Sequence, residues 1–240
     1  MKKTIGILGG MGPEATALFF ELIIKNTQAA KDQEHIPVII YNNPKIPPRT
    51  DAILKKGSNP FPLLLEGARI LRQAGADFIV MPCVTAHYYY PDLANQENIP
   101  FLNLLDETLS YVKNNLPALT RVGLIASTGT LLSKLFHDTF AKEDIEVINP
   151  SDAEQEQVME AIFGKQGLKA GFASGPAQKI IQDISAKLIQ KGAEAVIAGC
   201  TEIPLVLKPE DLSVPLIDPL KIMALKCIQE AGYKIKGDHN

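Results

Sequence analysis

The sequence contains no tryptophan and only three cysteines and four histidines among its 240 residues. Three cysteines cannot all pair within one chain, so a disulfide-stabilised scaffold is excluded. We expect a cytoplasmic protein with reduced thiols. A zinc site needs three or four converging ligands, and the sequence has neither an H-E-x-x-H nor a C-x-x-C pattern. These shortages argue against a metal centre.

Basic clusters and long apolar runs are also missing. The formal net charge is −3, and no group of lysines and arginines alternates with aromatic residues. No stretch approaches the roughly 20 apolar residues of a membrane span. The apolar run after Met1–Thr4 is short and ends at Gly9, which favours a first strand over a signal peptide. We therefore expect no nucleic-acid partner and no membrane partner.

Two short cysteine-containing stretches do stand out, because they resemble each other. Cys83 ends a segment that begins with the apolar run 78–80, and Cys200 ends a segment that begins with the run 195–197. Each run is preceded by a break that contains glycine. Open α/β sheets bind their ligands outside the carboxyl ends of their strands. A thiol is therefore predicted twice at a ligand-binding position.

The two stretches belong to an internal repeat, because three landmark pairs share one offset of 117 residues: Cys83 with Cys200, Gly75 with Gly192, and Gly6 with Gly123. Strand and helix patterns alternate, which predicts an α/β fold of two pseudo-symmetric domains with parallel four-stranded sheets and an active site in the cleft between them. The predicted divisions are 1–103 for the first half, 104–213 for the second, and 214–240 for a C-terminal strand and helix that pack back on the first half.

Apolar periodicity and turn residues predict the strands and helices of the two halves. Expected strands are 4–9, 37–41, 78–83 and 100–103, then 121–126, 146–148, 195–200 and 214–218. Expected helices include 14–29, 63–74, 106–116, 131–141, 176–190 and 219–231. Two loops, 42–59 and 164–175, are long enough to suggest a function. They carry the lone cations Arg49 and Lys169, which would suit a dianionic substrate.

The glycine turn after the first strand matches a dinucleotide-binding pattern. Residues 10–15 read Gly-Met-Gly-Pro-Glu-Ala, or G-x-G-x-x-A. The acid expected near the end of the second strand is absent, because Tyr41 and Asn42 stand there. A plain tight turn is one interpretation. We prefer an anion site around Met11, where backbone N–H groups at a helix start suit a carboxylate.

The three cysteines differ in their setting. Cys227 lies in a helical apolar pattern and is predicted to be core. Cys83 and Cys200 lie where a strand meets a loop, a setting that can make a thiol reactive. His87 follows Cys83 at i+4 and is predicted to make a local hydrogen bond or to tune Cys83. A Cys–His hydrolase dyad is an alternative, but it leaves Cys200 without a role.

Pseudo-symmetry places one thiol on each side of a small molecule held in the cleft. That arrangement suits removal of a proton from one face of a carbon and delivery of a proton to the other face. No cofactor is required if the site stabilises the carbanion. Hydroxyl and backbone N–H groups of the two halves could hold the substrate carboxylate; the candidates are Thr85, Ser127, Thr128 and Thr201.

Four segments together resemble the aspartate racemase branch of the aspartate/glutamate racemase superfamily: 9–14, 83–87, 127–130 and 199–202. The resemblance spans nearly the whole chain. It implies a cofactor-independent, two-base racemase of acidic amino acids that is usually a homodimer. It places the acid–base pair on Cys83 and Cys200 and the cations for the side-chain carboxylate on Arg49 and Lys169, with Lys165 a weaker candidate. The expected substrate-binding set is Met11, Arg49, Val84, Thr85, Ser127, Thr128, Lys169, Thr201 and Glu202.

One position departs from the family pattern. The family commonly has asparagine after the first cysteine, and here that residue is Val84. The departure bears on the choice of substrate more than on reaction type, because both thiols remain. Two other functions stay open at this point. One is a related cysteine-dependent isomerase, decarboxylase or hydrolase, and the other is an amino-acid-binding protein without catalysis.

Overall fold

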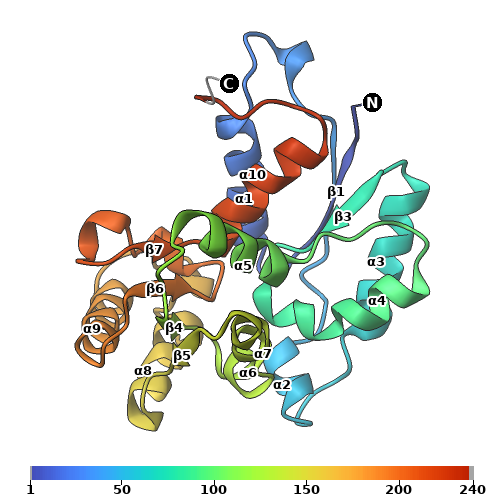
Figure 1. Cartoon of the computed structure of the whole chain (residues 1–240). Coiled ribbons are helices and arrows are strands. Elements are labelled where there is room, and N and C mark those ends of the chain that lie inside the picture. Colours follow the sequence, from blue (N-terminus) through green and yellow to red (C-terminus); the bar gives the residue numbers. More distant parts are fainter. Residues whose placement is uncertain (1, 238–240) are drawn as a thin grey trace.

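The computed structural model describes residues 2–237 and shows two α/β halves side by side (Figure 1). The strands are β1 (Ile5–Gly9), β2 (Val38–Asn42), β3 (Phe78–Val80), β4 (Arg121–Ile125), β5 (Glu146–Ile148), β6 (Ala195–Ala198) and β7 (Leu216–Ile217). The helices are α1 (Pro13–Asn26), α2 (Arg49–Ile53), α3 (Phe61–Gln73), α4 (Tyr90–Gln96), α5 (Leu104–Asn115), α6 (Thr128–Leu132), α7 (Leu135–Phe140), α8 (Asp152–Phe163), α9 (Pro176–Gln190) and α10 (Pro219–Glu230). No helix in this part of the chain combines the length and apolar character needed to cross a bilayer.

The first three strands of the two halves are arranged in the same order. Their orders are β2-β1-β3 and β5-β4-β6-β7, and every pairing is parallel. The register repeats too, because Ile5 pairs with Phe78 in the first sheet and Val122 pairs with Ala195 in the second. Both pairs are related by the offset of 117 residues found in the sequence. The predicted α/β fold with parallel sheets is confirmed.

The predicted first-half strand at 100–103 is wrong in extent. Only Phe101 bridges Ile79, so the first sheet has three strands rather than the expected four. The chain must turn at once, because Asn103 caps α5 by accepting a hydrogen bond from the backbone N–H of Leu105 at 2.9 Å. The second half keeps a two-residue strand, β7, at the matching place, before Asp218 caps α10.

Two other expectations need correction. The helix predicted at 131–141 is two short helices, α6 and α7, because Lys134 adopts a left-handed conformation with φ of 55° between them. The loop predicted at 42–59 contains the short helix α2, which begins at Arg49.

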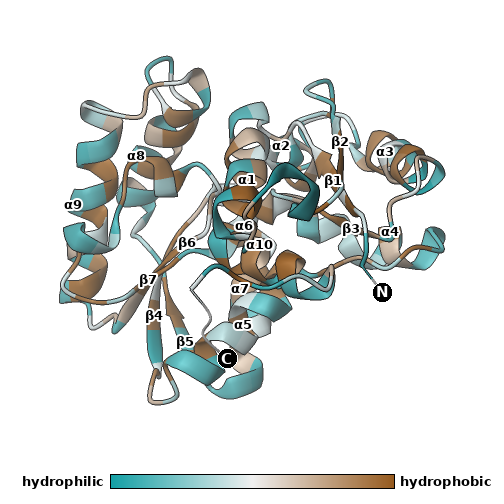
Figure 2. Cartoon of the chain, turned by 90° about the horizontal axis from the view of Figure 1, so that it is seen from above, coloured by the Kyte–Doolittle hydropathy of each residue, from teal (hydrophilic) through white to brown (hydrophobic). Residues whose placement is uncertain are grey.

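One hydrophobic cluster joins the two halves. It contains Ile5 of β1 and Val122 of β4, together with Phe19 of α1, Leu109 of α5 and Met223 of α10. The helices α1, α5 and α10 therefore lie between the sheets, and α10 packs on both of the others (Figure 1). Figure 2 shows the apolar faces of the helices turned toward the sheets. The divisions at residues 103 and 213 remain a prediction.

Candidate active site

The loops that follow β1, β3, β4 and β6 meet at one cavity of about 730 Å³. Cys83 and Cys200 both line it, and their residues are 5% and 9% exposed. The repeat therefore does bring the two thiols to one cavity, each from the carboxyl end of the third strand of its half. All predicted substrate-binding residues except Thr128 line the same cavity, and the weaker candidate Lys165 does not.

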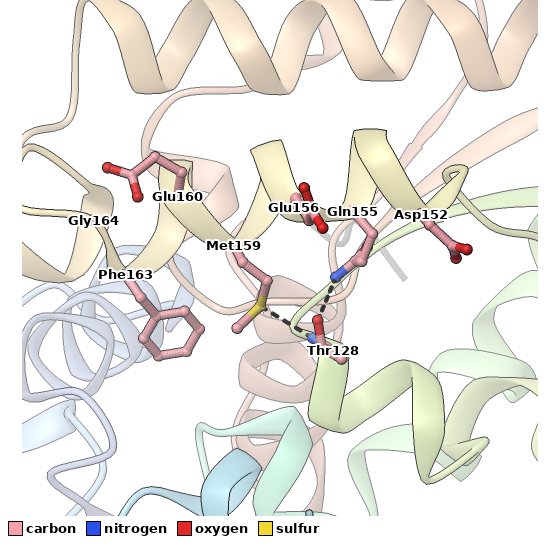
Figure 3. A pocket seen from close by; sticks show the side chains of 8 residues that line it. All are labelled: Thr128, Asp152, Gln155, Glu156, Met159, Glu160, Phe163 and Gly164. Atoms are coloured by element: carbon pink, nitrogen blue, oxygen red, sulfur yellow. Dashed lines mark hydrogen bonds between the residues drawn. The ribbon is translucent and has the colours of Figure 1, made fainter.

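Thr128 instead faces a second cavity of about 460 Å³ beside α8 (Figure 3). Its backbone N–H lies 3.2 Å from Sδ of Met159, and its hydroxyl accepts a hydrogen bond from Gln155. Met159 and Phe163 line both cavities, so α8 forms the wall between them. The second cavity contains no cysteine and no lysine or arginine, which makes the cysteine cavity the candidate active site.

The glycine turn after β1 brings a backbone carbonyl of the first half to both cations. Arg49 Nη2 donates to the carbonyl oxygen of Met11 at 3.0 Å, and Lys169 Nζ lies 3.4 Å from the same oxygen. A Cβ at Gly12 would lie 3.2 Å from Oε1 of Glu202, so the absence of a side chain lets this turn approach the second half closely.

Arg49 is held by its own loop. Its Nη1 donates to the carbonyl oxygens of Ile46 and Pro47 at 3.3 and 3.0 Å. Its Nε is buried and has no hydrogen-bond partner within residues 2–237. Arg49 itself lines the cavity, where its positive charge favours a carboxylate of a bound molecule.

Lys169 and Glu202 form a partly buried ion pair in the cavity wall. Burial alone would lower the pKa of Lys169, but the acidic groups beside it and the hydrogen bond to Glu202 outweigh burial and raise that pKa. The ammonium also lies 5.7 Å from the ring centre of Phe163. Lys169 is therefore charged, and it keeps a third donor beyond its contacts to Glu202 and Met11.

Cys200 differs from Cys83 in its hydrogen bonding. The Sγ of Cys200 donates to Oε2 of Glu202 at 3.0 Å. Burial and the neighbouring Glu202 raise the pKa of Cys200 well above its usual value, against an opposing effect of Lys169. Within residues 2–237 the Sγ of Cys83 has no hydrogen-bond partner.

Three hydroxyl groups connect the halves at the edge of the site. Thr85 Oγ1 lies 3.1 Å from Ser127 Oγ and 2.9 Å from Thr130 Oγ1, and the last two are 3.2 Å apart. Thr130 was missed by the sequence reasoning, although it follows Ser127 by three residues. Thr130 could have been found from the N-cap position of Ser127, because the third residue of a helix, here Thr130, lies beside the N-cap side chain.

His87 supports the cysteine loop without reaching the thiol. Its Nδ1 lies 3.0 Å from the carbonyl oxygen of Cys83, and its Nε2 accepts a hydrogen bond from the backbone N–H of Leu104 at 3.2 Å. Both ring nitrogens are thus used by the backbone. Burial lowers the pKa of His87 to about 4. A neutral, doubly engaged imidazole does not fit the general base of a Cys–His dyad.

Several residues that line the cavity were missed. They are Ile46, Pro47 and Pro48 of the loop before α2, and Met159 and Phe163 of α8. Nothing in the apolar spacing of α8 distinguishes these two residues from ordinary packing. In the first half, Val84 is 2% exposed and gives the wall beside Cys83 an apolar surface.

The known proteins most informative for this chain are racemases. Over 230 residues, 92% of this chain and 94% of the other, it is 28% identical to the broad specificity amino-acid racemase RacX of Bacillus subtilis. The structure of Picrophilus torridus aspartate racemase superposes with a TM-score of 0.86 at 29% identity, covering 98% of this chain and 96% of that one. Glutamate racemase from Francisella tularensis, in complex with D-glutamate, shares the fold with a TM-score of 0.68 at 20% identity, over 96% and 82% of the two chains.

The model of the Asp/Glu/Hydantoin racemase family matches residues 8–227, a span that includes both cysteine loops, both cations and the helices that join the halves. The chain is an enzyme of the isomerase class, an amino-acid racemase that belongs to the Asp/Glu/Hydantoin racemase family.

Proposed function

We propose that this protein racemises an acidic amino acid, aspartate or glutamate, by a cofactor-independent two-base mechanism in which Cys83 and Cys200 exchange protons with Cα. The observation that carries the proposal is that two thiols from equivalent positions of a repeat line one cavity together with Arg49 and Lys169. No other pair of titratable groups in this cavity is related by the repeat within residues 2–237.

The reaction needs one thiolate and one thiol. The thiolate removes the Cα proton from one face, and the opposite thiol delivers its own proton to the other face, so the two cysteines exchange protonation states. Electrostatic stabilisation of the carbanionic intermediate comes from donors around the α-carboxylate. The hydroxyls of Thr85, Ser127 and Thr201 line the cavity and are suited to this task.

Two cationic residues are available to bind the side-chain carboxylate of the substrate. Arg49 and Lys169 both line the cavity, and Lys169 keeps a third N–H beyond its contacts to Glu202 and Met11. Likeness to an aspartate racemase at 29% identity supports the same choice. The family commonly has asparagine at the position of Val84, so the wall beside Cys83 lacks that polar group here. We expect this difference to influence whether aspartate or glutamate reacts faster.

Incubation of L-aspartate, L-glutamate and a panel of neutral L-amino acids in deuterated water tests the proposal. The expected result is the D-isomer of an acidic amino acid, with deuterium at Cα. Exchange confined to neutral amino acids would contradict the acidic substrate while leaving the two-thiol mechanism intact.

Alanine variants of each cysteine test the mechanism separately. Cys83→Ala and Cys200→Ala should each lose racemisation by several orders of magnitude, because one of the two proton transfers has no group to perform it. Each variant should still exchange the Cα proton of one enantiomer without inverting it. Cys227→Ala is the matched control, since this buried thiol of α10 lies outside the cavity. Racemisation at the control's rate in either of the other variants would overturn the two-base mechanism.

A homodimer is also proposed, on the basis of the family resemblance, and so is a cytoplasmic location, on the basis of the odd number of cysteines and the short first apolar run. Light scattering on the purified protein and fractionation of expressing cells test them. A monomer at working concentration would contradict the first, and recovery outside the cytoplasmic fraction would contradict the second.

A further inference from the structure

The repeat is broken at one chemically important position. Thr85 follows Cys83 by two residues, and Glu202 follows Cys200 by two residues. The Thr85 hydroxyl turns to Ser127 and Thr130. The Glu202 carboxylate turns to Cys200. The two thiols are therefore equivalent in the fold but unequal in their surroundings.

Glu202 is fully engaged inside the protein. Its residue is 1% exposed, its Oε2 accepts hydrogen bonds from Cys200 Sγ at 3.0 Å and Thr201 Oγ1 at 3.3 Å, and its Oε1 pairs with Lys169. The sequence placed Glu202 among the substrate-binding residues. Both oxygens are occupied by protein groups, one by Lys169 and the other by the thiol of Cys200 and the hydroxyl of Thr201.

We propose that Glu202 is a positioning residue that keeps the proton on Cys200, so that the free enzyme rests with Cys200 as the acid and Cys83 as the base. This inference deepens the racemase mechanism proposed above and rests on it. The carboxylate accepts the S–H proton in a charge-assisted hydrogen bond. A thiolate at the same place would instead put a second negative charge beside a buried carboxylate.

The charges around Cys200 support this assignment. Glu202 faces it from its own loop, Lys169 comes from the segment after α8, and Cys83 lines the same cavity from the first half. Lys169 partly offsets the carboxylate, and the pKa of Cys200 is nevertheless raised, first by burial and then by Glu202. Lys169 is thus the group that limits the effect of Glu202.

The proton balance of a turnover follows. The Cys83 thiolate takes the Cα proton and becomes a thiol, while Cys200 gives its proton to the opposite face and becomes a thiolate beside Glu202. Before the next turnover in the same direction, one proton must pass from Cys83 to Cys200 through solvent. No electron is gained or lost. In the reverse direction the substrate must bind the less populated form of the enzyme, in which Cys200 is the thiolate and Cys83 the thiol.

Alkylation of the free enzyme by iodoacetamide, followed by mass spectrometry of each cysteine, tests the inference without any turnover. Alkylation follows the thiolate fraction, so Cys83 should react first in the wild type. In Glu202→Gln the rate at Cys200 should rise about tenfold or more, because a hydrogen bond to a charged acceptor is lost. The rate at Cys83 should change little. The matched control is Glu156→Gln, an exposed acid of α8 outside the cysteine cavity, which should leave both rates unchanged.

Lys169→Met supplies a second variant with the opposite sign. Removal of the ammonium leaves Glu202 uncompensated, so alkylation at Cys200 should fall. An unchanged Cys200 rate in Glu202→Gln would overturn the inference, and so would equal increases at both cysteines, which indicate a loosened fold. Failure of the wild type to racemise any amino acid would overturn the proposed function, whereas the alkylation rates would still decide the role of Glu202.

Discussion

His87 makes the stability of this protein depend on pH in a predictable direction. The imidazole is 2% exposed and sits between the carbonyl of Cys83 and the N–H of Leu104. Desolvation of the charged form lowers its pKa from 6.5 to about 4, against smaller opposing effects of backbone hydrogen bonds and Asp106. The unfolded chain therefore binds a proton at His87 at a pH where the folded chain does not.

The sign and size of the effect follow from linkage. Because the folded pKa is the lower one, the free energy of unfolding falls as the pH drops through 6.5 toward 4. Each unit of pKa difference corresponds to about 1.4 kcal/mol. The loss is therefore about 2 kcal/mol between about pH 7 and about pH 5, and about 3 kcal/mol once the pH falls below 4.

Urea unfolding of the wild type and of His87→Gln at several pH values between about 7 and about 5 measures this loss. Glutamine does not titrate, so the variant should begin less stable at neutral pH, and the gap to the wild type should close by about 2 kcal/mol in acid. His35→Gln, which changes a partly exposed histidine outside the core, is the control and should follow the wild-type curve. Parallel curves for the wild type and His87→Gln would refute the reasoning.

Three further changes test other parts of the structure. Gly67→Ala would place a Cβ 2.5 Å from Cδ1 of Leu8, so the unfolding free energy should fall by about 1–3 kcal/mol in thermal or urea unfolding; unchanged stability would contradict the packing of α3 on β1. Thr85→Val removes the hydroxyl that meets Ser127 across the halves and should cost about 1 kcal/mol in the same assay, while an equally stable variant would show that this contact contributes nothing. Arg49→Lys replaces a planar fork with a single ammonium and should raise KM for the acidic amino acid about tenfold in initial-rate measurements; an unchanged KM would exclude Arg49 from substrate binding.

Much of the fold could be predicted because short sequence patterns, namely glycines, apolar runs and cysteines, recur at one offset in the two halves. The offset between Gly6 and Gly123 predicted the equivalence of β1 and β4, and the runs before Cys83 and Cys200 predicted β3 and β6. The break between α6 and α7 could not be predicted in the same way. Lys134 is a good helix former, so its type gives no sign of the left-handed backbone that it adopts.

The sequence predicted which residues form the site better than it predicted the contacts that these residues make. Motifs identified Cys83, Cys200 and Arg49, because strand ends and long loops mark ligand positions in an α/β fold. Side-chain direction is decided by tertiary structure, and spacing does not reveal it. The i+4 spacing of His87 predicted a local hydrogen bond or a group that tunes Cys83, and only the structure shows that the ring bonds to the carbonyl oxygen of that residue.

The pairing of α5 with α10 has a consequence for the origin of the chain. These helices are equivalent, because each directly follows the capping residue, Asn103 or Asp218, at the end of the matching segment of its half. A surface that packs on its own equivalent is what a twofold homodimer presents. The pair is therefore what the fusion of two identical half-length subunits would leave behind. In a single chain the two cysteine loops need not be identical, as they would be in a dimer of identical half-length subunits, and here Thr85 stands in one loop and Glu202 in the other.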